Sequence, residues 1–138
     1  MTKVKICGIT SMEDAIDAAR LGADYLGFNF YRHSPRYIEK SKIKKIMEKL
    51  PKKVKKVGIF VNDGIERIKN ISEDCNLDFV QLSGDEDVAF ISTLRKSLNK
   101  KIIKSFRIRN EEDIKKAVQF QKRFPSENFF VLLDSFKD

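Results

Sequence analysis

Tryptophan is absent from the 138-residue sequence, histidine occurs once and cysteine occurs twice. The single His33 and the lack of a paired cysteine motif leave no zinc-site signature, so no metal is expected. Cys7 and Cys75 are too few for a disulfide framework, which favours a reduced, cytoplasmic protein. No apolar run approaches the roughly 18 residues of a membrane span. A strand predicted from residue 3 also leaves no room for an apolar signal segment.

Acidic side chains are outnumbered, with 20 against 28 basic ones, so the net charge is +8 and the pI is near 9.5. The densest basic stretch covers residues 40–56 and would suit a nucleic-acid or acidic-membrane surface. However, Ile43, Ile46, Met47 and Leu50 occur in it at helical spacing, and lysine offers no bidentate recognition of bases. We therefore interpret the stretch as the solvated face of a helix, and expect neither nucleic acid nor a membrane as partner.

Segments typical of strands and helices alternate along the whole chain. Six apolar segments predict strands, at residues 3–7, 24–30, 57–61, 78–82, 101–108 and 128–134. Apolar residues at helical spacing lie between them, including a basic helix at 41–50. This alternation requires a parallel sheet with right-handed crossovers, in a chain of the length of one domain. The sheet is either open and doubly wound or part of a (β/α)8 barrel. No G-x-G-x-x-G follows the first strand, so a dinucleotide-binding sheet is unsupported.

Polar or reactive side chains follow several predicted strands: Cys7, Asn29, Asn62, Gln81 with Ser83, and Asp134. A ring of such residues drawn from many strands is what a barrel active site needs. Cys7 would lie beside a helix N-terminus, for which Thr10 and Glu13 predict a capping box. The positive end of that helix favours a thiolate. A lone cysteine at a strand end is more often a packing residue, so on the residues alone both interpretations stay open.

The stretch from Lys5 to Thr10, KICGIT, resembles the opening motif of phosphoribosylanthranilate isomerases, the (β/α)8 barrels of the tryptophan pathway. Four further stretches resemble that family in the same order along the chain: residues 27–30 with 34–37, 57–62, 81–86 and 132–135. Each motif is short, but together they cover essentially the whole sequence. Two features depart from the family. Ser83 stands where the family usually has histidine, and the family barrel has eight βα units where this sequence predicts six strands.

The resemblance therefore implies an α/β fold that is an incomplete (β/α)8 TIM barrel. We expect its first six strands with five intervening helices, as one partial barrel domain over residues 1–138 that lacks the last two βα units. In the family, the missing strands carry the glycine-rich loops that hold the substrate phosphate. Impaired activity is expected, and so is self-association through the open barrel edges.

The implied activity is that of an isomerase, an intramolecular oxidoreductase that interconverts aldose and ketose. Its Amadori rearrangement turns the phosphosugar N-(5-phosphoribosyl)anthranilate into the 1-amino-1-deoxyribulose phosphate, the third step from chorismate to tryptophan. The resemblance assigns Cys7 as the general base and Asp134 as the general acid. It implies no cofactor and no metal. An acid at neutral pH needs a raised pKa, so we expect Asp134 to be buried among apolar neighbours.

The resemblance also assigns substrate contacts. Arg36 matches the position that binds the anthranilate carboxylate, a task that suits a planar guanidinium group. Ser83 is a weaker candidate that could donate one hydrogen bond. Without the resemblance Asp134 would pass for a helix-capping aspartate and Arg36 for a surface arginine. Two alternatives stay open: a non-catalytic barrel fragment that acts as an assembly module, and a basic nucleic-acid-binding protein.

Overall fold

The structure is a computed structural model that describes residues 1–125 and 127–135. Strands and helices alternate throughout: β1 (Lys5–Cys7), α1 (Met12–Arg20), β2 (Tyr25–Asn29), α2 (Lys40–Lys49), β3 (Lys55–Phe60), α3 (Ile65–Asp74), β4 (Phe79–Leu82), α4 (Val88–Ser97), β5 (Lys101–Ile108), α5 (Glu111–Arg123) and β6 (Phe129–Ser135). The predicted strands and helices are confirmed, and the boundaries given above differ from the observed ones by at most two residues.

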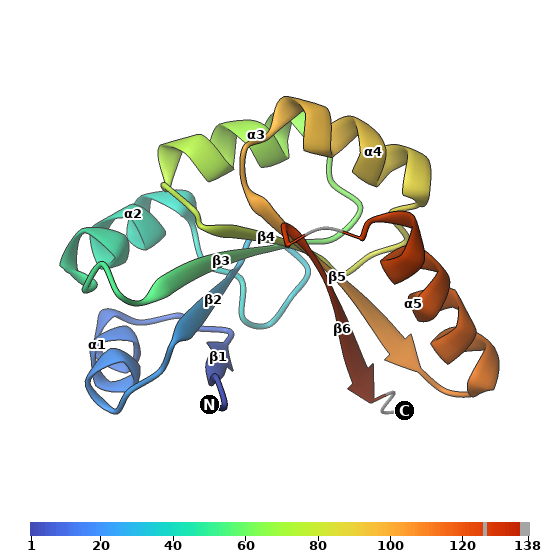
Figure 1. The fold of residues 1–138 in the computed structure, drawn as a ribbon. Coiled ribbons are helices and arrows are strands. Elements are labelled where there is room, and N and C mark those ends of the chain that lie inside the picture. Colours follow the sequence, from blue (N-terminus) through green and yellow to red (C-terminus); the bar gives the residue numbers. More distant parts are fainter. Residues whose placement is uncertain (126, 136–138) are drawn as a thin grey trace.

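All strand pairs are parallel, and the strands follow one another in sequence order from β1 to β6. Figure 1 shows a curved sheet with the five helices along its outer side. A doubly wound sheet would reverse its strand order at a switch point and carry helices on both faces. The arrangement is therefore that of an incomplete barrel, as expected. Among the described residues, no helix has the length and apolar character needed to cross a membrane.

Alternation along β2 separates the two faces of the sheet. Leu26, Phe28 and the following Phe30 are at most 2% exposed and belong to the cluster that packs against the helices. Phe30 stacks on Phe60 with 5.1 Å between ring centroids. Since side chains alternate along a strand, Gly27 and Asn29 point to the opposite, concave face. The main hydrophobic core thus lies between sheet and helices, and the concave face carries polar residues together with buried apolar ones such as Val57 and Ile59.

The start of α1 differs from the expectation. The predicted capping box of Thr10 and Glu13 is wrong, because the N-cap is Ser11, whose hydroxyl accepts from the amide of Asp14 at 3.1 Å. Serine caps a helix at least as well as threonine, so the helix begins at the later of two adjacent hydroxyl residues. The helix ends at the C-cap Leu21, and Gly22 follows with a φ of +97°, a conformation that glycine adopts readily.

The basic stretch forms α2 and the turn after it. Ile43, Ile46 and Met47 are buried, and the lysines of the helix are exposed. Lys40 pairs with Asp74 of α3 at 2.6 Å. This is the arrangement of an amphipathic surface helix, as the spacing of the isoleucines predicts.

The short strand β1 is fastened by a carboxylate that stands just before β2. The amide of Val4 donates to Oδ2 of Asp24 at 2.8 Å, and Nζ of Lys3 donates to Oδ1 at 3.2 Å. The amides of Asp24 and Tyr25 donate back to the carbonyl of Val4. The Val4 N–H, followed by Lys3, holds the pKa of Asp24 below its ordinary value of 3.8.

Replacing Asp24 by Ala should loosen the start of β1. The ionised carboxyl is the stabilising form, so its contribution is complete above the ordinary pKa and is lost as the pH falls through the lower folded-state value. At pH 7 we expect Asp24→Ala to reduce the protection of the Val4 amide against hydrogen exchange, measured by NMR. Asp17→Ala, which removes an exposed contact to Arg20 within α1, is the control. Equal protection of Val4 in both variants would contradict this role.

Candidate active site

A cavity of about 1020 Å³ lies at the carboxyl ends of the strands. Its lining includes all the polar strand-end residues that the sequence indicates: Cys7, Asn29, Asn62, Gln81, Ser83 and Asp134. These residues come from five strands or the loops that follow them, because parallel strands all end at the same rim. The residues of the expected ring thus line a single cavity. Within the part of the chain that the structure describes, no group of three or more His, Cys, Asp or Glu residues could hold a metal ion.

Cys7 ends β1 with an exposed thiol. It pairs in register with Gly27 of β2. A Cβ atom built on Gly27 would lie 3.2 Å from Sγ of Cys7 and 3.1 Å from Cδ1 of Ile59, closer than most side chains pack. The missing side chain at Gly27 therefore makes room for the thiol on the concave face.

Arg36 is not among the residues that line the cavity, but its side chain passes over Gly8, the residue that follows Cys7. Its Nη1 donates to the carbonyl oxygen of Cys7 at 3.3 Å. Gly8 has a φ of +82°, which only glycine adopts at little cost, and a Cβ there would lie 2.9 Å from Nη1 of Arg36. Gly8 thus allows both the turn after β1 and the close passage of the guanidinium group.

Asp134 lines the same cavity from β6, but the expectation that it is buried is wrong. Its side chain is exposed, and the neighbouring Leu133 is 57% exposed. The reason is its place in the sheet, since β6 is an edge strand whose one partner among the described strands is β5. Cys7 and Asp134 therefore approach the cavity from the two opposite edges of the sheet.

Ser83 joins a hydrogen-bonded chain across the concave face. Nζ of Lys5 donates to Oε1 of Gln81, and Nε2 of Gln81 donates to Oγ of Ser83 at 3.1 Å. The hydroxyl of Ser105 donates to the same Oγ at 3.0 Å. Both lone pairs of Ser83 are engaged, so its proton is the group that can donate into the cavity. The chain links β1, β4 and β5 at the level of the site.

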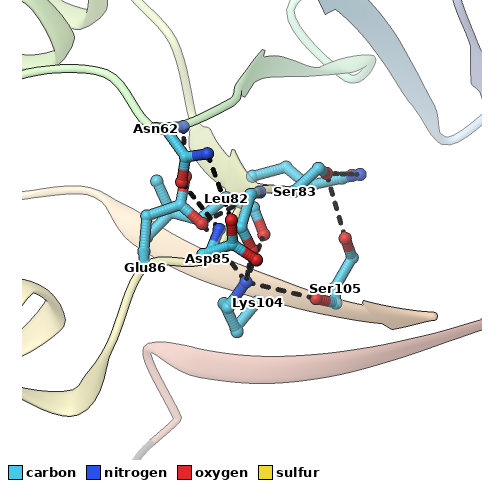
Figure 2. A network of polar contacts seen from close by, with 9 residues as sticks. Asn62, Leu82, Ser83, Asp85, Glu86, Lys104 and Ser105 are labelled. Atoms are coloured by element: carbon cyan, nitrogen blue, oxygen red, sulfur yellow. Dashed lines mark hydrogen bonds and ion pairs between the residues drawn. The ribbon is translucent and has the colours of Figure 1, made fainter. Parts of the chain in front are cut away.

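A buried ion pair fixes the loops beside Ser83 (Figure 2). The side chains of Lys104 and Glu86 are 4% and 2% exposed, with Nζ and Oε2 3.2 Å apart. Nζ of Lys104 also donates to the carbonyl oxygens of Gly84 at 2.6 Å and Ser105 at 3.3 Å. Burial lowers the pKa of Lys104, and the charge of Glu86 opposes that shift.

The same carboxylate binds the loop after β3. Glu86 accepts from the amides of Asn62 and Gly84, each at 2.9 Å. Asn62 adopts a φ of +50°, and its Oδ1 accepts from the amide of Asp85 at 2.7 Å. A Cβ on Gly84 would lie 2.8 Å from the amide nitrogen of Asn62, so glycine is required there. Two loops of the cavity wall are thus held to β5 by one ammonium group.

The sequence prediction missed Lys5, Lys104 and Glu86 as parts of the site. Lys104 lies in a strand of alternating polar and apolar residues, KIIKSFRI, and resembles an exposed strand lysine. Its position on the helix-facing side, between Ile102 and Phe106, was the available signal. Lys5 likewise stands two residues before Cys7 and must share its face.

A family model and a curated relative both match the chain. The family model of N-(5'-phosphoribosyl)anthranilate (PRA) isomerase matches residues 4–137. An N-(5'-phosphoribosyl)anthranilate isomerase of Thermotoga neapolitana is 42% identical over 135 residues, which are 98% of this chain and 62% of that protein. The chain thus spans about three fifths of the length of this curated relative.

Solved structures agree with the sequence matches. The crystal structure of phosphoribosyl anthranilate isomerase from Thermotoga maritima superposes with a TM-score of 0.91 at 36% identity, over 100% of this chain and 63% of that one. A phosphoribosyl anthranilate isomerase in complex with reduced 1-(o-carboxyphenylamino)-1-deoxyribulose 5-phosphate gives a TM-score of 0.89 at 37% identity, over 99% of this chain and 66% of that one.

Replacing Lys104 by Met should leave the Glu86 carboxylate buried without its cation. Such a loss costs about 3 kcal/mol or more of unfolding free energy. We expect urea denaturation to show this loss for Lys104→Met. Adding Glu86→Gln should recover part of it, since the carboxylate is then neutral. Lys96→Met, at an exposed position of α4, is the matched control. A Lys104→Met variant as stable as that control would contradict the role of the pair.

Proposed function

The chain belongs to the N-(5'-phosphoribosyl)anthranilate isomerase family, and from that premise we propose that it carries the acid–base pair of an Amadori rearrangement. The observation that carries the proposal is that Cys7 and Asp134 line one cavity from opposite edges of the sheet. The substrate is the phosphosugar that the family name specifies, and the product is the corresponding ketose. The proposed setting is tryptophan biosynthesis in the cytoplasm, which suits the free thiols of Cys7 and Cys75.

Asp134 is the proposed general acid. Its carboxylic proton goes to the ribose ring oxygen, and the bond between that oxygen and C1 breaks. The lone pair of the anthranilate nitrogen then forms a C=N bond to C1, which opens the ring. The exposed position of Asp134 at the cavity edge gives a substrate access to it.

Cys7 is the proposed general base. Its thiolate takes the proton from C2, the electron pair of that C–H bond forms a C1=C2 bond, and the C=N pair returns to nitrogen. The resulting enol becomes the ketone when O2 loses a proton and C1 gains one. Gly27 supports this assignment, since it leaves space for a thiol that points into the cavity. Base catalysis by a positioned side chain contributes about 10²- to 10⁴-fold.

Arg36 is the proposed partner of the anthranilate carboxylate. Its guanidinium group presents five N–H donors in a fixed plane, and Nη1 is anchored to the Cys7 carbonyl oxygen. The anchor places the positive charge beside the proposed base. A carboxylate bound there would set the aromatic ring, and hence C1 and C2, next to Cys7. Ser83 is proposed as a hydrogen-bond donor to the substrate. Its oxygen accepts from Gln81 and Ser105, and its hydroxyl proton is not used in either contact.

The chain spans 62% of the Thermotoga neapolitana relative, so the activity of a whole family barrel is a proposal for it. The family resemblance assigns the substrate phosphate to loops after a seventh and an eighth strand, and the described residues contain six. The six strands supply the acid, the base and the carboxylate contact. We propose that tight binding of the phosphate requires the remaining units of the barrel.

An isomerase assay on two forms of the protein tests the proposal. One form is the 138-residue chain, and the other is that chain fused to the segment of the Thermotoga neapolitana relative that follows the matched region. We expect the fusion to consume phosphoribosylanthranilate, and Cys7→Ala or Asp134→Asn to reduce its kcat by about 10²- to 10⁴-fold. Cys75→Ala, which changes the buried thiol at the C-cap of α3, is the control. An inactive fusion, or an active one that tolerates Cys7→Ala, would overturn the assignment.

Gly8→Ala should displace Arg36 and weaken substrate binding. The added Cβ collides with the guanidinium group, so the contact with the substrate carboxylate is lost. That loss corresponds to a KM about tenfold higher, with a smaller effect on kcat. Gly22→Ala is the matched control, since Gly22 has a φ of +97° and nothing lies within 4 Å of its Cβ position. Both variants carry the strain of a positive φ. An equal KM in the two would contradict the role of Arg36.

A further inference from the structure

Lys5 has no part in the mechanism above, although it stands next to the site. It lies on β1 two residues before Cys7, so both side chains point to the concave face. Its ammonium group donates to Oε1 of Gln81, which comes from β4 and lines the cavity. The residue is half-buried. A positive charge is thus held on the concave face, directly beneath the proposed base along the strand.

The partner of Lys5 is itself fixed in orientation. An ammonium group has donors only, so the atom of Gln81 that faces it must be the oxygen Oε1. Nε2 of Gln81 then points to Oγ of Ser83, which Ser105 also engages. Gln81 is 6% exposed. Side chains from β4 and β5 therefore hold the charge of Lys5 in one place.

Lys5 interacts electrostatically with both members of the proposed acid–base pair. Burial lowers the pKa of Lys5, and the negative charges of ionised Cys7 and Asp134 oppose that shift. The two groups belong to opposite edges of the sheet. Interactions between charges are mutual, so the ammonium group of Lys5 attracts a negative charge on either of them.

We propose that Lys5 is a positioning residue whose positive charge balances the negative charge of the acid–base pair. That negative charge moves from Cys7 to Asp134 in each turnover. The inference rests on the proposed function. At the start Cys7 is a thiolate and Asp134 a carboxylic acid. After ring opening and loss of the C2 proton, Cys7 is a thiol and Asp134 a carboxylate. The proton on Cys7 then returns to Asp134 through solvent. The pair carries one negative charge before and after the chemistry, and Lys5 faces it in both states.

A purely structural role for Lys5 makes a different prediction. If Lys5 only bridged β1 to Gln81, a neutral hydrogen-bond donor of similar length could replace it, and Lys5→Gln would behave like the wild type. If its charge matters, Lys5→Arg should restore the site and Lys5→Gln should not. Burial of its charge opposes folding, so Lys5→Met should leave the midpoint of thermal unfolding unchanged or higher. Loss of function without loss of stability is the signature of the charge role.

Alkylation of Cys7 by iodoacetamide tests the proposal without reference to isomerase activity. The reagent is neutral and reacts with the thiolate, and peptide mass spectrometry distinguishes the two cysteines. We expect Lys5→Met and Lys5→Gln to slow alkylation of Cys7 at pH 7 several-fold, because the variants lack the positive charge that attracts the thiolate. Lys5→Arg should stay close to the wild type. Cys75, which is 3% exposed and whose pKa burial raises, is the internal reference.

Two further variants complete the test. Lys3→Met removes an exposed ammonium group two residues away that binds Asp24, and should leave the alkylation rate unchanged. Gln81→Glu keeps the shape of the partner but neutralises Lys5, and should slow alkylation as Lys5→Met does. Wild-type rates in Lys5→Met and Gln81→Glu, or rescue by Lys5→Gln, would overturn the proposal. In the active fusion the same variants should lower kcat at an unchanged KM. An inactive fusion would refute the proposed function, and the alkylation rates would still decide the role of Lys5 toward Cys7.

Discussion

Parallel pairing of all six strands is the constraint on which the site depends. Each strand must end at the same rim, so whatever follows a strand is delivered to one shared region. The hydrophobic core occupies the space between the sheet and the helices and is built from alternate residues such as Leu26 and Phe28. The other face is then free to carry polar groups, and the sheet curves around them.

Burying charged groups beside the cavity destabilises a fold unless those groups are paired. Lys104 and Glu86 are almost fully buried, but they satisfy each other and five further backbone groups. Within the described residues no buried side-chain nitrogen or oxygen lacks a hydrogen-bond partner. The loops after β3 and β4 are therefore ordered before any ligand arrives. Such preorganisation is what an acid–base site needs, because the positions of its groups set the rate.

Periodicity and strand–helix alternation were sufficient to predict the order and type of every element. The ring of strand-end residues also followed from the sequence, because residues that follow parallel strands all lie at the same rim of the sheet. The exposure of Asp134 could not be predicted, because it depends on which strands flank β6 rather than on the local sequence. The roles of Lys5 and Lys104 were hidden for a similar reason. A lysine in a strand looks solvent-exposed until its partners, Gln81 and Glu86, are brought to it by other strands.

Cys7 and Asp134 belong to the first and last strands in the order of the sheet, yet they serve one cavity. Five successive strand pairings separate them, and each contributes its own twist. Their separation is therefore a sum of small rotations, and a slight error in any pairing is carried through to the two side chains. The distance between these two side chains therefore depends on the curvature of the whole sheet. Substitutions far from the cavity that flatten or tighten the sheet would alter the distance between the two groups before they unfolded the protein.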